Sequence, residues 1–172
     1  MKVLLTGASG NLGRAIIETK PKWVKLIKIR RKDLDLSSTR ECRDIVTRIK
    51  PDWIFNCGAY TNVEKAEKEP DLALAINSHA PRVFAESLKA TGGKILQIST
   101  DYVFNGAQNK PYLTNQQRNP INIYGKSKAL AEELVQEILG GTNQGVILRT
   151  SWLMGPTGKN FLTTMLNLLQ EK

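Results

Sequence analysis

The sequence predicts an α/β fold in which a doubly wound parallel sheet carries helices on both faces. Two observations lead to this prediction. Five short apolar runs rich in Val and Ile alternate with longer segments whose apolar residues recur at helical spacing. A glycine-rich stretch also joins the first apolar run to the first helical segment. Because no repeat, low-complexity segment or linker interrupts the alternation, residues 1–172 are expected to form one domain.

The expected strands are KVLL, VKLIKI, WIFNC, KILQIS and GVILRT, at residues 2–5, 24–29, 53–57, 94–99 and 145–150. All are bounded by turn residues, which is typical of strands buried in a parallel sheet. Helical spacing predicts helices at residues 11–20, 38–49, 70–90, 122–139 and 159–171. Each helix would carry the chain back across the sheet, as parallel strands require. Pro81 should kink or split the third helix, because proline has no backbone N–H.

The composition excludes several classes of protein. Apolar residues make up 41% of the chain and are spread along it, which is typical of a globular protein. No run approaches the roughly 18 apolar residues of a membrane span, and the N-terminus turns glycine-rich too early for a signal peptide. We therefore expect a cytoplasmic protein without membrane contact. The net charge of +9 comes from scattered basic residues without a nucleic-acid-binding motif, so an anionic small ligand or a solvated basic surface explains it better.

Thiol and metal chemistry have little support in the sequence. Cys42 and Cys57 lie in different expected elements and form no C-x-x-C pair, so free thiols are expected. His79 is the single histidine, and no Cys/His cluster is present. We therefore expect no protein-built zinc site and interpret His79 as an ordinary helix residue.

The stretch TGASGNLG follows the first expected strand and opens the first expected helix. Gly7, Gly10 and Gly13 form G-x-x-G-x-x-G, whose first gap is one residue longer than in the usual dinucleotide-binding motif. Glycine permits a tight turn and a close approach of the backbone to a pyrophosphate, and the helix N-terminus offers amides to the phosphates. A plain glycine-rich turn is the alternative. The flanking strand and helix favour a Rossmann-type site that includes Asn11 and Leu12.

The end of the second expected strand, KIRRKDLDL, should select the cofactor. Arg30 and Arg31 occupy the place where NAD-binding domains usually carry an acidic residue for the ribose hydroxyls. A guanidinium suits a 2′-phosphate, so NADP or NADPH is favoured over NAD. Asp33, about 20 residues beyond the last of the three glycines, keeps NAD as an alternative. Asp35 and Leu36 complete this edge of the predicted cofactor site.

A tyrosine and a lysine one helical turn apart are candidates for chemistry. Tyr124 and Lys128 lie four residues apart in INIYGKSKAL, so their side chains should share one helix face. The ammonium would lower the pKa of the phenol and let it donate a proton to a carbonyl oxygen near neutral pH. Ser99 or Thr100, at the end of the fourth strand, could hydrogen-bond the same oxygen. A solvated helix face is the alternative for an isolated Tyr-x-x-x-Lys pair.

Several motifs together resemble one family. They are TGASGNLG, NCGAYTNVEKAEKEP, AINSHAP, ISTDYVFNG, NPINIYGKSKALAEE and LRTSWLMGPTGKNF, and they cover nearly the whole chain. In this order they are similar to the extended short-chain dehydrogenase/reductases and, within these, to the dTDP-4-dehydrorhamnose reductases. The combination of STDYVFNG, YGKSK and RTSW is far more specific than the glycines alone.

The resemblance implies a catalytic set of Thr100, Tyr124 and Lys128. Tyr124 would protonate the C4 oxygen of dTDP-4-dehydro-L-rhamnose as NADPH delivers hydride, which gives dTDP-L-rhamnose in dTDP-rhamnose biosynthesis. Lys128 would lower the tyrosine pKa and hold the nicotinamide ribose, while Thr100 orients the carbonyl. Tyr102 and Trp152 match positions that lie against the sugar, with ordinary packing at a pocket wall as the alternative for Trp152.

The resemblance also extends the cofactor site. Backbone at Cys57, Gly58, Ala59 and Tyr60 would line the cofactor together with Ser99, so Cys57 is expected to be a small core residue and not a nucleophile. Relatives commonly carry acidic residues in the loop before the catalytic tyrosine, whereas PYLTNQQRNP has none. The role of this loop in substrate fit therefore stays open.

Family members continue well past the last expected helix, into strands and helices that close over the nucleotide sugar. We therefore expect residues 1–172 to be an NADP-binding domain that carries the catalytic residues and lacks most of the substrate-binding portion. The resemblance also allows a homodimer and a Mg²⁺ site. Two other functions stay open: a non-catalytic NADP-binding regulatory subunit, resembling that of methionine adenosyltransferase, and a nucleotide-sugar epimerase or dehydratase.

Overall fold

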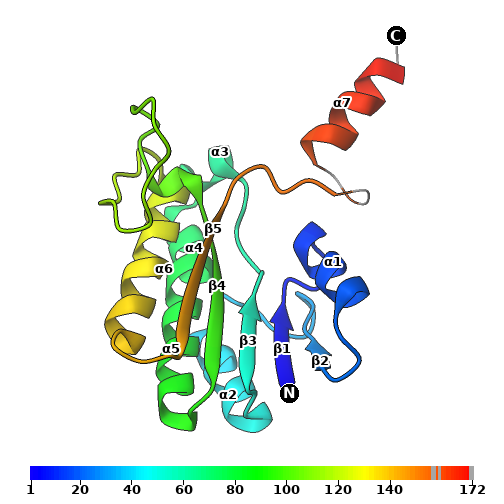
Figure 1. Cartoon of the computed structure of the whole chain (residues 1–172), viewed down its shortest axis with the longest axis vertical. Helices are drawn as coiled ribbons and strands as arrows, with labels where there is room; N and C mark the ends of the chain where they lie inside the picture. The colour runs from blue at the N-terminus through cyan, green and yellow to red at the C-terminus, as the bar shows by residue number, and fades with distance from the viewer. Residues whose placement is uncertain (156–157, 159, 171–172) are drawn as a thin grey trace.

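The computed structural model describes residues 1–155, 158 and 160–170. Its five parallel strands are β1 (Lys2–Thr6), β2 (Lys25–Lys28), β3 (Trp53–Asn56), β4 (Lys94–Thr100) and β5 (Gly145–Thr150). They lie in the order β2-β1-β3-β4-β5 (Figure 1). The chain moves from β1 outward to β2 and then returns past β1 to β3, so the strand order reverses between β1 and β3. Open α/β sheets bind ligands at the carboxyl ends of the strands at such a reversal.

The helices alternate with the strands as the sequence predicts. They are α1 (Asn11–Thr19), α2 (Thr39–Ile49), α3 (Val63–Ala66), α4 (Pro70–Leu74), α5 (Ala80–Thr91), α6 (Ile123–Leu139) and α7 (Phe161–Gln170), with a 3₁₀ turn, η2 (Asp101–Val103), after β4. Right-handed crossovers in opposite directions place α1 and α2 on opposite faces of the sheet. Figure 1 shows α2, α5 and α6 side by side on one face. The predicted Rossmann-type fold is confirmed, although its two faces are covered unequally.

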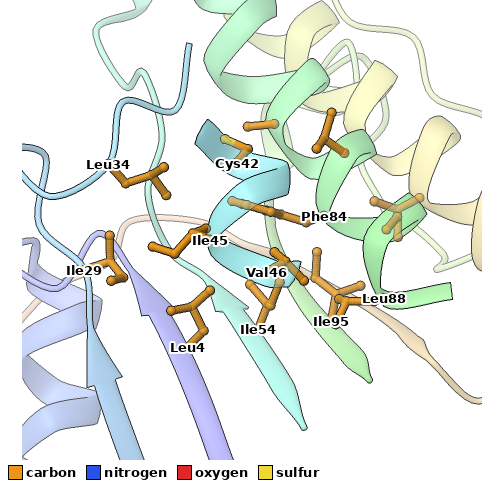
Figure 2. Packing of buried hydrophobic residues seen from close by; sticks show 14 of the residues in the cluster. Leu4, Ile29, Leu34, Cys42, Ile45, Val46, Ile54, Phe84, Leu88 and Ile95 are labelled. Atoms are coloured by element: carbon orange, nitrogen blue, oxygen red, sulfur yellow. The ribbon is translucent and has the colours of Figure 1, made fainter. Parts of the chain in front are cut away.

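One apolar core lies between the sheet and the three helices that share a face (Figure 2). Leu4, Ile54 and Ile95 are direct register partners on β1, β3 and β4. They pack with Phe84 of α5 and Val46 of α2, and all five side chains are fully buried. Because strand side chains alternate between faces, this packing fixes the register of the three central strands and keeps their carboxyl ends level.

Pro81 marks a change of helix type. The single helix expected at residues 70–90 is formed by α4, a π-helical turn, η1 (Ala75–His79), and α5, which follow one another directly. Pro81 is the second residue of α5, so the wider π turn lies immediately before it. The π turn takes the place of a regular α-helical turn. In a regular turn, the proline ring would approach the backbone carbonyl four residues earlier. The kink or split expected at Pro81 is thus a π turn between two α-helices. His79 is a helix residue, as predicted.

The surface formed by β5 and α7 is apolar and exposed. β5 is an edge strand, and its Val146 and Leu148 are 45% and 47% exposed. α7 buries none of its residues and stands apart from the sheet in Figure 1. Residues 159 and 171 of the helix expected there lie outside the described part of the chain. Among the described residues, no helix combines the length and apolar character needed to cross a membrane.

The core packing predicts a large penalty for truncating Phe84. Phe84→Ala should lower the free energy of unfolding by about 3–5 kcal/mol, because the buried ring leaves a cavity among α2, α5 and the sheet. Chemical denaturation followed by circular dichroism would measure this change. Phe161→Ala is the matched control, because Phe161 on α7 is 51% exposed, and it should change stability by less than about 1 kcal/mol. Equal losses in the two variants would contradict the assignment of the core.

Candidate active site

A cleft of about 830 Å³ runs along the carboxyl ends of the strands, where the strand order reverses. Its volume is in the range of small-molecule and cofactor sites. Segments far apart in the sequence contribute to its walls: the turn after β1, the residues after β3, the end of β4, the start of α6 and the residues after β5. The reversal therefore gathers most of the predicted site residues in one cleft.

The turn between β1 and α1 lies directly against the chain that leaves β3. Gly7 has a φ of +64°, and a Cβ there would lie 2.6 Å from backbone atoms of Cys57 and Gly58. A Cβ on Gly13 would lie 2.3 Å from the carbonyl oxygen of Gly7. Glycine is therefore required at both positions. This close packing leaves the N-terminus of α1 open to the cleft, as suits the phosphates of a dinucleotide.

All five residues predicted in the glycine turn line the cleft: Gly7, Gly10, Asn11, Leu12 and Gly13. Gly10 is the residue that precedes the first turn of α1, and it has ordinary backbone angles. The predicted turn is thus present, with its glycines in the places where a dinucleotide would need them.

The residues after β2 that were expected at the adenosine edge lie outside the lining of the cleft. The backbone N–H and the Nε of Arg30 donate to Asp33 Oδ2 at 3.1 and 3.0 Å. These hydrogen bonds lower the pKa of Asp33. Arg31 is exposed and makes no salt bridge with the described residues. Asp35 Oδ1 accepts two hydrogen bonds of 2.8 Å from the backbone and hydroxyl of Ser37. The Arg30 guanidinium is therefore bound to a carboxylate, whereas the Arg31 side chain is exposed.

Leu36 connects this edge to the cleft. A Cβ on Gly58 would lie 2.7 Å from Leu36 Cδ1, so the leucine packs against the glycine. Cys57, Gly58 and Ala59 line the cleft as predicted. Burial raises the pKa of the Cys57 thiol to about 12, which supports a packing role and argues against a nucleophile.

Tyr60 differs from the three residues before it. Its hydroxyl donates to Glu69 Oε2 at 2.7 Å, and its backbone N–H donates to Asn77 Oδ1 at 2.8 Å. Its phenol is therefore engaged with Glu69 and not among the groups that line the cleft. The backbone at Tyr60 serves instead to attach this segment to the helix that contains Asn77.

Asn77 is a structural residue of the site that the sequence analysis missed. It lies in the π turn η1, is buried, and donates to Tyr60 O and Ser127 Oγ at 3.0 Å each. The neighbouring Ser78 donates to Ser127 O at 2.7 Å. The π turn thus joins the chain after β3 to helix α6. The adjacent polar residues in AINSHAP, within an otherwise apolar helical stripe and just before a proline, were the signal that could have indicated it.

Helix α6 begins at a well-defined position beside β4. The side chain of Asn122 accepts from Gly125 N at 2.7 Å, and Glu67 Oε1 accepts from Ile123 N at 2.8 Å. A Cβ on Gly125 would lie 2.3 Å from Tyr102 O, so the first turn of α6 packs directly on η2. This contact places Tyr124 beside Tyr102, with their rings edge to face at a centroid distance of 5.7 Å.

Thr100 is the hydroxyl that accompanies Tyr124. Its Oγ1 donates to Asp101 Oδ1 at 3.0 Å, accepts from Tyr102 N at 3.2 Å and hydrogen-bonds with the phenol of Tyr124. Ser99 Oγ instead donates to Glu132 Oε1 at 2.5 Å. Of the two hydroxyls that the sequence left open, the structure therefore favours Thr100.

The pKa of Tyr124 is raised, which corrects the expectation that Lys128 lowers it. Burial of the phenol is the main cause, the hydrogen bond with Thr100 acts in the opposite direction, and the charge of Asp101 raises the pKa further. Lys128 is not among the groups that shift this pKa in the structure, where its ammonium donates to Ile98 O at 2.5 Å. The two side chains share a helix face and a cleft, as predicted, but the ammonium is held by the backbone of β4.

Lys128 is itself strongly perturbed by its surroundings. It is buried, and burial lowers its pKa to about 8, while Glu132 and Cys57 act to raise it. An ordinary lysine titrates near 10.4. The Lys128 ammonium can therefore lose its proton close to physiological pH, a property typical of lysines at functional sites.

Tyr102 and Trp152 line the outer part of the cleft. Trp152 has a φ of +51°, which is unusual for a bulky residue, and its side chain is 67% exposed. Its ring packs edge to face on Phe161 at 4.9 Å. A strained, exposed aromatic residue at the mouth of a cleft is a better candidate for ligand contact than for core packing. Among the described residues, no three His, Cys, Asp or Glu side chains come together as a metal site would require.

Three comparisons place this site among known proteins. The family model described as RmlD substrate binding domain matches residues 1–172. A dTDP-4-dehydrorhamnose reductase from Streptomyces griseus is 39% identical over 166 residues, covering 96% of this chain and 54% of the relative. The crystal structure of a dTDP-4-dehydrorhamnose reductase from Clostridium acetobutylicum ATCC 824 has 39% identity and a TM-score of 0.93, covering 99% of this chain and 60% of that one.

A second solved structure adds a cofactor. The dTDP-4-dehydrorhamnose reductase from Bacillus anthracis str. Ames, in complex with NADP, has 40% identity and a TM-score of 0.92, with coverage of 99% and 60%. The chain thus spans 54–60% of the length of these three relatives. The chain belongs to the RmlD substrate binding domain family, and the resemblance of its motifs to the dTDP-4-dehydrorhamnose reductases is confirmed.

Proposed function

We propose that this chain is the NADPH-binding and catalytic part of a reductase that converts dTDP-4-dehydro-L-rhamnose to dTDP-L-rhamnose. The observation that carries the proposal is the convergence of Thr100, Tyr124 and Lys128 on a glycine-walled cleft at the reversal of strand order. The reductase names of the three relatives, at 39–40% identity, support the same substrate class.

The proposal assigns residues 1–172 to the cofactor-binding part of such an enzyme. The cleft supports this because the glycine turn, the residues after β3 and the start of α6 are all packed in place. The exposed apolar side chains of β5 and α7 also support it, since such surface is typically covered by another part of a protein. In longer relatives, a further portion of the chain would then complete the sugar site.

The described residues fit a nicotinamide dinucleotide. The N-terminus of α1 would bind the phosphates, and the segment that includes Leu36 and Gly58 would lie against the adenosine. Arg31 would bind a 2′-phosphate, because Arg30 is already engaged with Asp33. NADPH is therefore favoured over NADH, and the NADP complex of the Bacillus anthracis relative supports this choice. When bound, the reduced nicotinamide supplies the hydride.

The proton would come from Tyr124. Its phenol and the Thr100 hydroxyl lie together at the end of β4, so one carbonyl oxygen could accept hydrogen bonds from both. As hydride reaches C4 of the sugar, the phenol proton would pass to the oxygen and leave an alcohol and a phenolate. The Lys128 ammonium, four residues along α6, would stabilise that phenolate. Since burial and the charge of Asp101 raise the Tyr124 pKa, this stabilisation is needed to make the phenol an effective acid.

Tyr124→Phe should abolish turnover while NADPH affinity is retained. Removing a general acid typically costs about 10²–10⁴-fold in rate, whereas the cofactor contacts of the glycine turn do not involve the phenol. NADPH absorbance with the 4-keto sugar would measure turnover, and fluorescence titration would measure cofactor binding. Tyr60→Phe is the control, because its hydroxyl donates to Glu69 at 2.7 Å and is not among the groups that line the cleft.

The same assay separates the competing functions. NADPH binding without oxidation by the wild-type chain would be expected of a regulatory subunit, or of a catalytic part that needs a further portion of the protein for the sugar. Conversion of a nucleotide sugar without net consumption of cofactor would support an epimerase or dehydratase. Parallel loss of turnover and cofactor affinity in Tyr124→Phe would contradict the proposed acid role.

Turnover should fall as the pH rises through about 8, the pKa of Lys128. Below that pH the ammonium is charged and can stabilise the phenolate, and above it the neutral amine cannot. A pH profile of kcat would show the decline. Lys126→Met, at an exposed position on the same helix, is the control and should show the same decline. A rate that stays constant to pH 10 would show that the charge of Lys128 is not required.

Arg31→Ala should weaken NADPH binding about tenfold or more and leave NADH binding nearly unchanged, because only NADPH carries the 2′-phosphate. Isothermal titration calorimetry with both cofactors would measure the ratio of affinities. Arg48→Ala is the matched control, because exposed Arg48 lies in the last turn of α2. Equal weakening of both cofactors by Arg31→Ala would contradict this role.

A further inference from the structure

A buried carboxylate behind the cleft is not one of the groups proposed to contact the substrate or the cofactor. Glu132 lies one turn beyond Lys128 on α6, and its side chain is completely buried. Arg149 donates to both of its oxygens, from Nε at 2.9 Å and from Nη2 at 2.6 Å. Ser99 Oγ donates at 2.5 Å and Arg118 Nη1 at 3.2 Å. Both oxygens of this carboxylate therefore accept hydrogen bonds from protein side chains. The function of Glu132 must involve the groups that it binds.

The partners of Glu132 come from three separate segments, all outside the helix that carries it. Ser99 is on β4 directly before Thr100, and Arg149 is on β5 shortly before the residues that line the outer cleft. Arg118 lies in the wall loop, which we define as residues 104–122 between η2 and α6. Six residues of this loop also line the cleft: Phe104, Asn105, Gly106, Tyr112, Ile121 and Asn122. Glu132 therefore joins the reaction strand, the edge strand and the wall loop to the helix that carries Tyr124.

Arg149 extends the connection into the wall loop. Its Nη1 donates to Thr114 O at 3.0 Å, and its guanidinium lies 4.9 Å from the centroid of the Phe104 ring. Arg118 Nη1 also donates to Gln136 Oε1 on α6 at 3.1 Å. Both arginines thus bind the carboxylate and the loop or helix beside it. The wall loop has no regular secondary structure, so these contacts replace the backbone ladder that a strand or helix would provide.

The Glu132 carboxylate and the Arg149 guanidinium stabilise each other in their charged forms. Burial acts to raise the Glu132 pKa, but hydrogen bonds from Arg149 and Ser99 together outweigh it and lower the pKa. The pKa of Arg149 is raised in turn, chiefly by its hydrogen bond to Glu132. Loss of the carboxylate would leave two guanidinium groups beside a buried ammonium at Lys128. Such an arrangement would separate the segments that Glu132 now joins.

We propose that Glu132 is a positioning residue for the substrate side of the cleft, where it holds the wall loop and the end of β5 against the reaction strand through Arg118 and Arg149. The cofactor side is held by other contacts, because the glycine turn packs on the backbone of the chain after β3. The inference rests on the proposed function only for the identity of the substrate.

Hydrogen–deuterium exchange of the whole chain tests this proposal without turnover. Glu132→Gln and Arg118→Gln should each speed amide exchange in the wall loop about tenfold or more, as loss of a charge-assisted hydrogen bond implies. Exchange at residues 1–20 and the Kd for NADPH should change less than about twofold. Arg118→Gln leaves the Glu132–Arg149 pair intact, so it serves where Glu132→Gln does not fold. Glu133→Gln, at the exposed neighbouring position, is the matched control and should change none of these.

Uniformly faster exchange, with residues 1–20 affected as much as the wall loop, would reduce Glu132 to a general stability role and overturn the proposal. An unchanged wall loop in Arg118→Gln would overturn it as well. With the 4-keto sugar, Arg118→Gln should raise KM about tenfold at nearly unchanged NADPH affinity. If the wild-type chain oxidises no NADPH with this sugar, the proposed function fails, but the exchange comparison still decides the role of Glu132.

Discussion

The close approach of two glycine-containing turns determines the site. Gly7 sits against the backbone of Cys57 and Gly58 at a distance that excludes any Cβ. This contact lets the turns after β1 and β3 meet at the place where the strand order reverses. Without it, the N-terminus of α1 could not face the end of β4, and the phosphate-binding and proton-donating groups would lie in different clefts. The core below supports it, because paired residues on β1, β3 and β4 keep the strand ends level.

Helix α6 is the second organising element, and it carries polar groups where a helix normally buries apolar ones. Tyr124, Lys128 and Glu132 are spaced four residues apart, so they form one stripe along the helix. The stripe faces the end of β4, where Ile98 O binds the ammonium and Ser99 Oγ binds the carboxylate. Helix and strand are therefore held together by buried hydrogen bonds as well as by packing. This explains how the reaction side chains keep fixed positions beside an open cleft.

Much of this arrangement could be predicted from local sequence. The strands, the glycine turn and the shared face of Tyr124 and Lys128 depend on periodicity and spacing over a few residues. Pro81 and the polar residues of AINSHAP indicated an irregular helix at the π turn, but the partners of Asn77 could not be predicted, because Tyr60 and Ser127 are distant in sequence. The predicted direction of the Tyr124 pKa shift was wrong, because the shift is set by burial of the phenol and by the charge of Asp101, and spacing along a helix reports neither.

The cofactor side and the substrate side of the cleft differ in how tightly their walls are packed. On the cofactor side, backbone packs on backbone at the glycines, and little can move without a clash. On the substrate side, Tyr102 is 44% and Trp152 67% exposed, and the wall loop depends on two arginines and one carboxylate. Hydride transfer to a carbonyl benefits from exclusion of water. Under the proposed function, the described residues would orient the cofactor and the proton donor, whereas closure over the sugar would need further groups at this exposed rim.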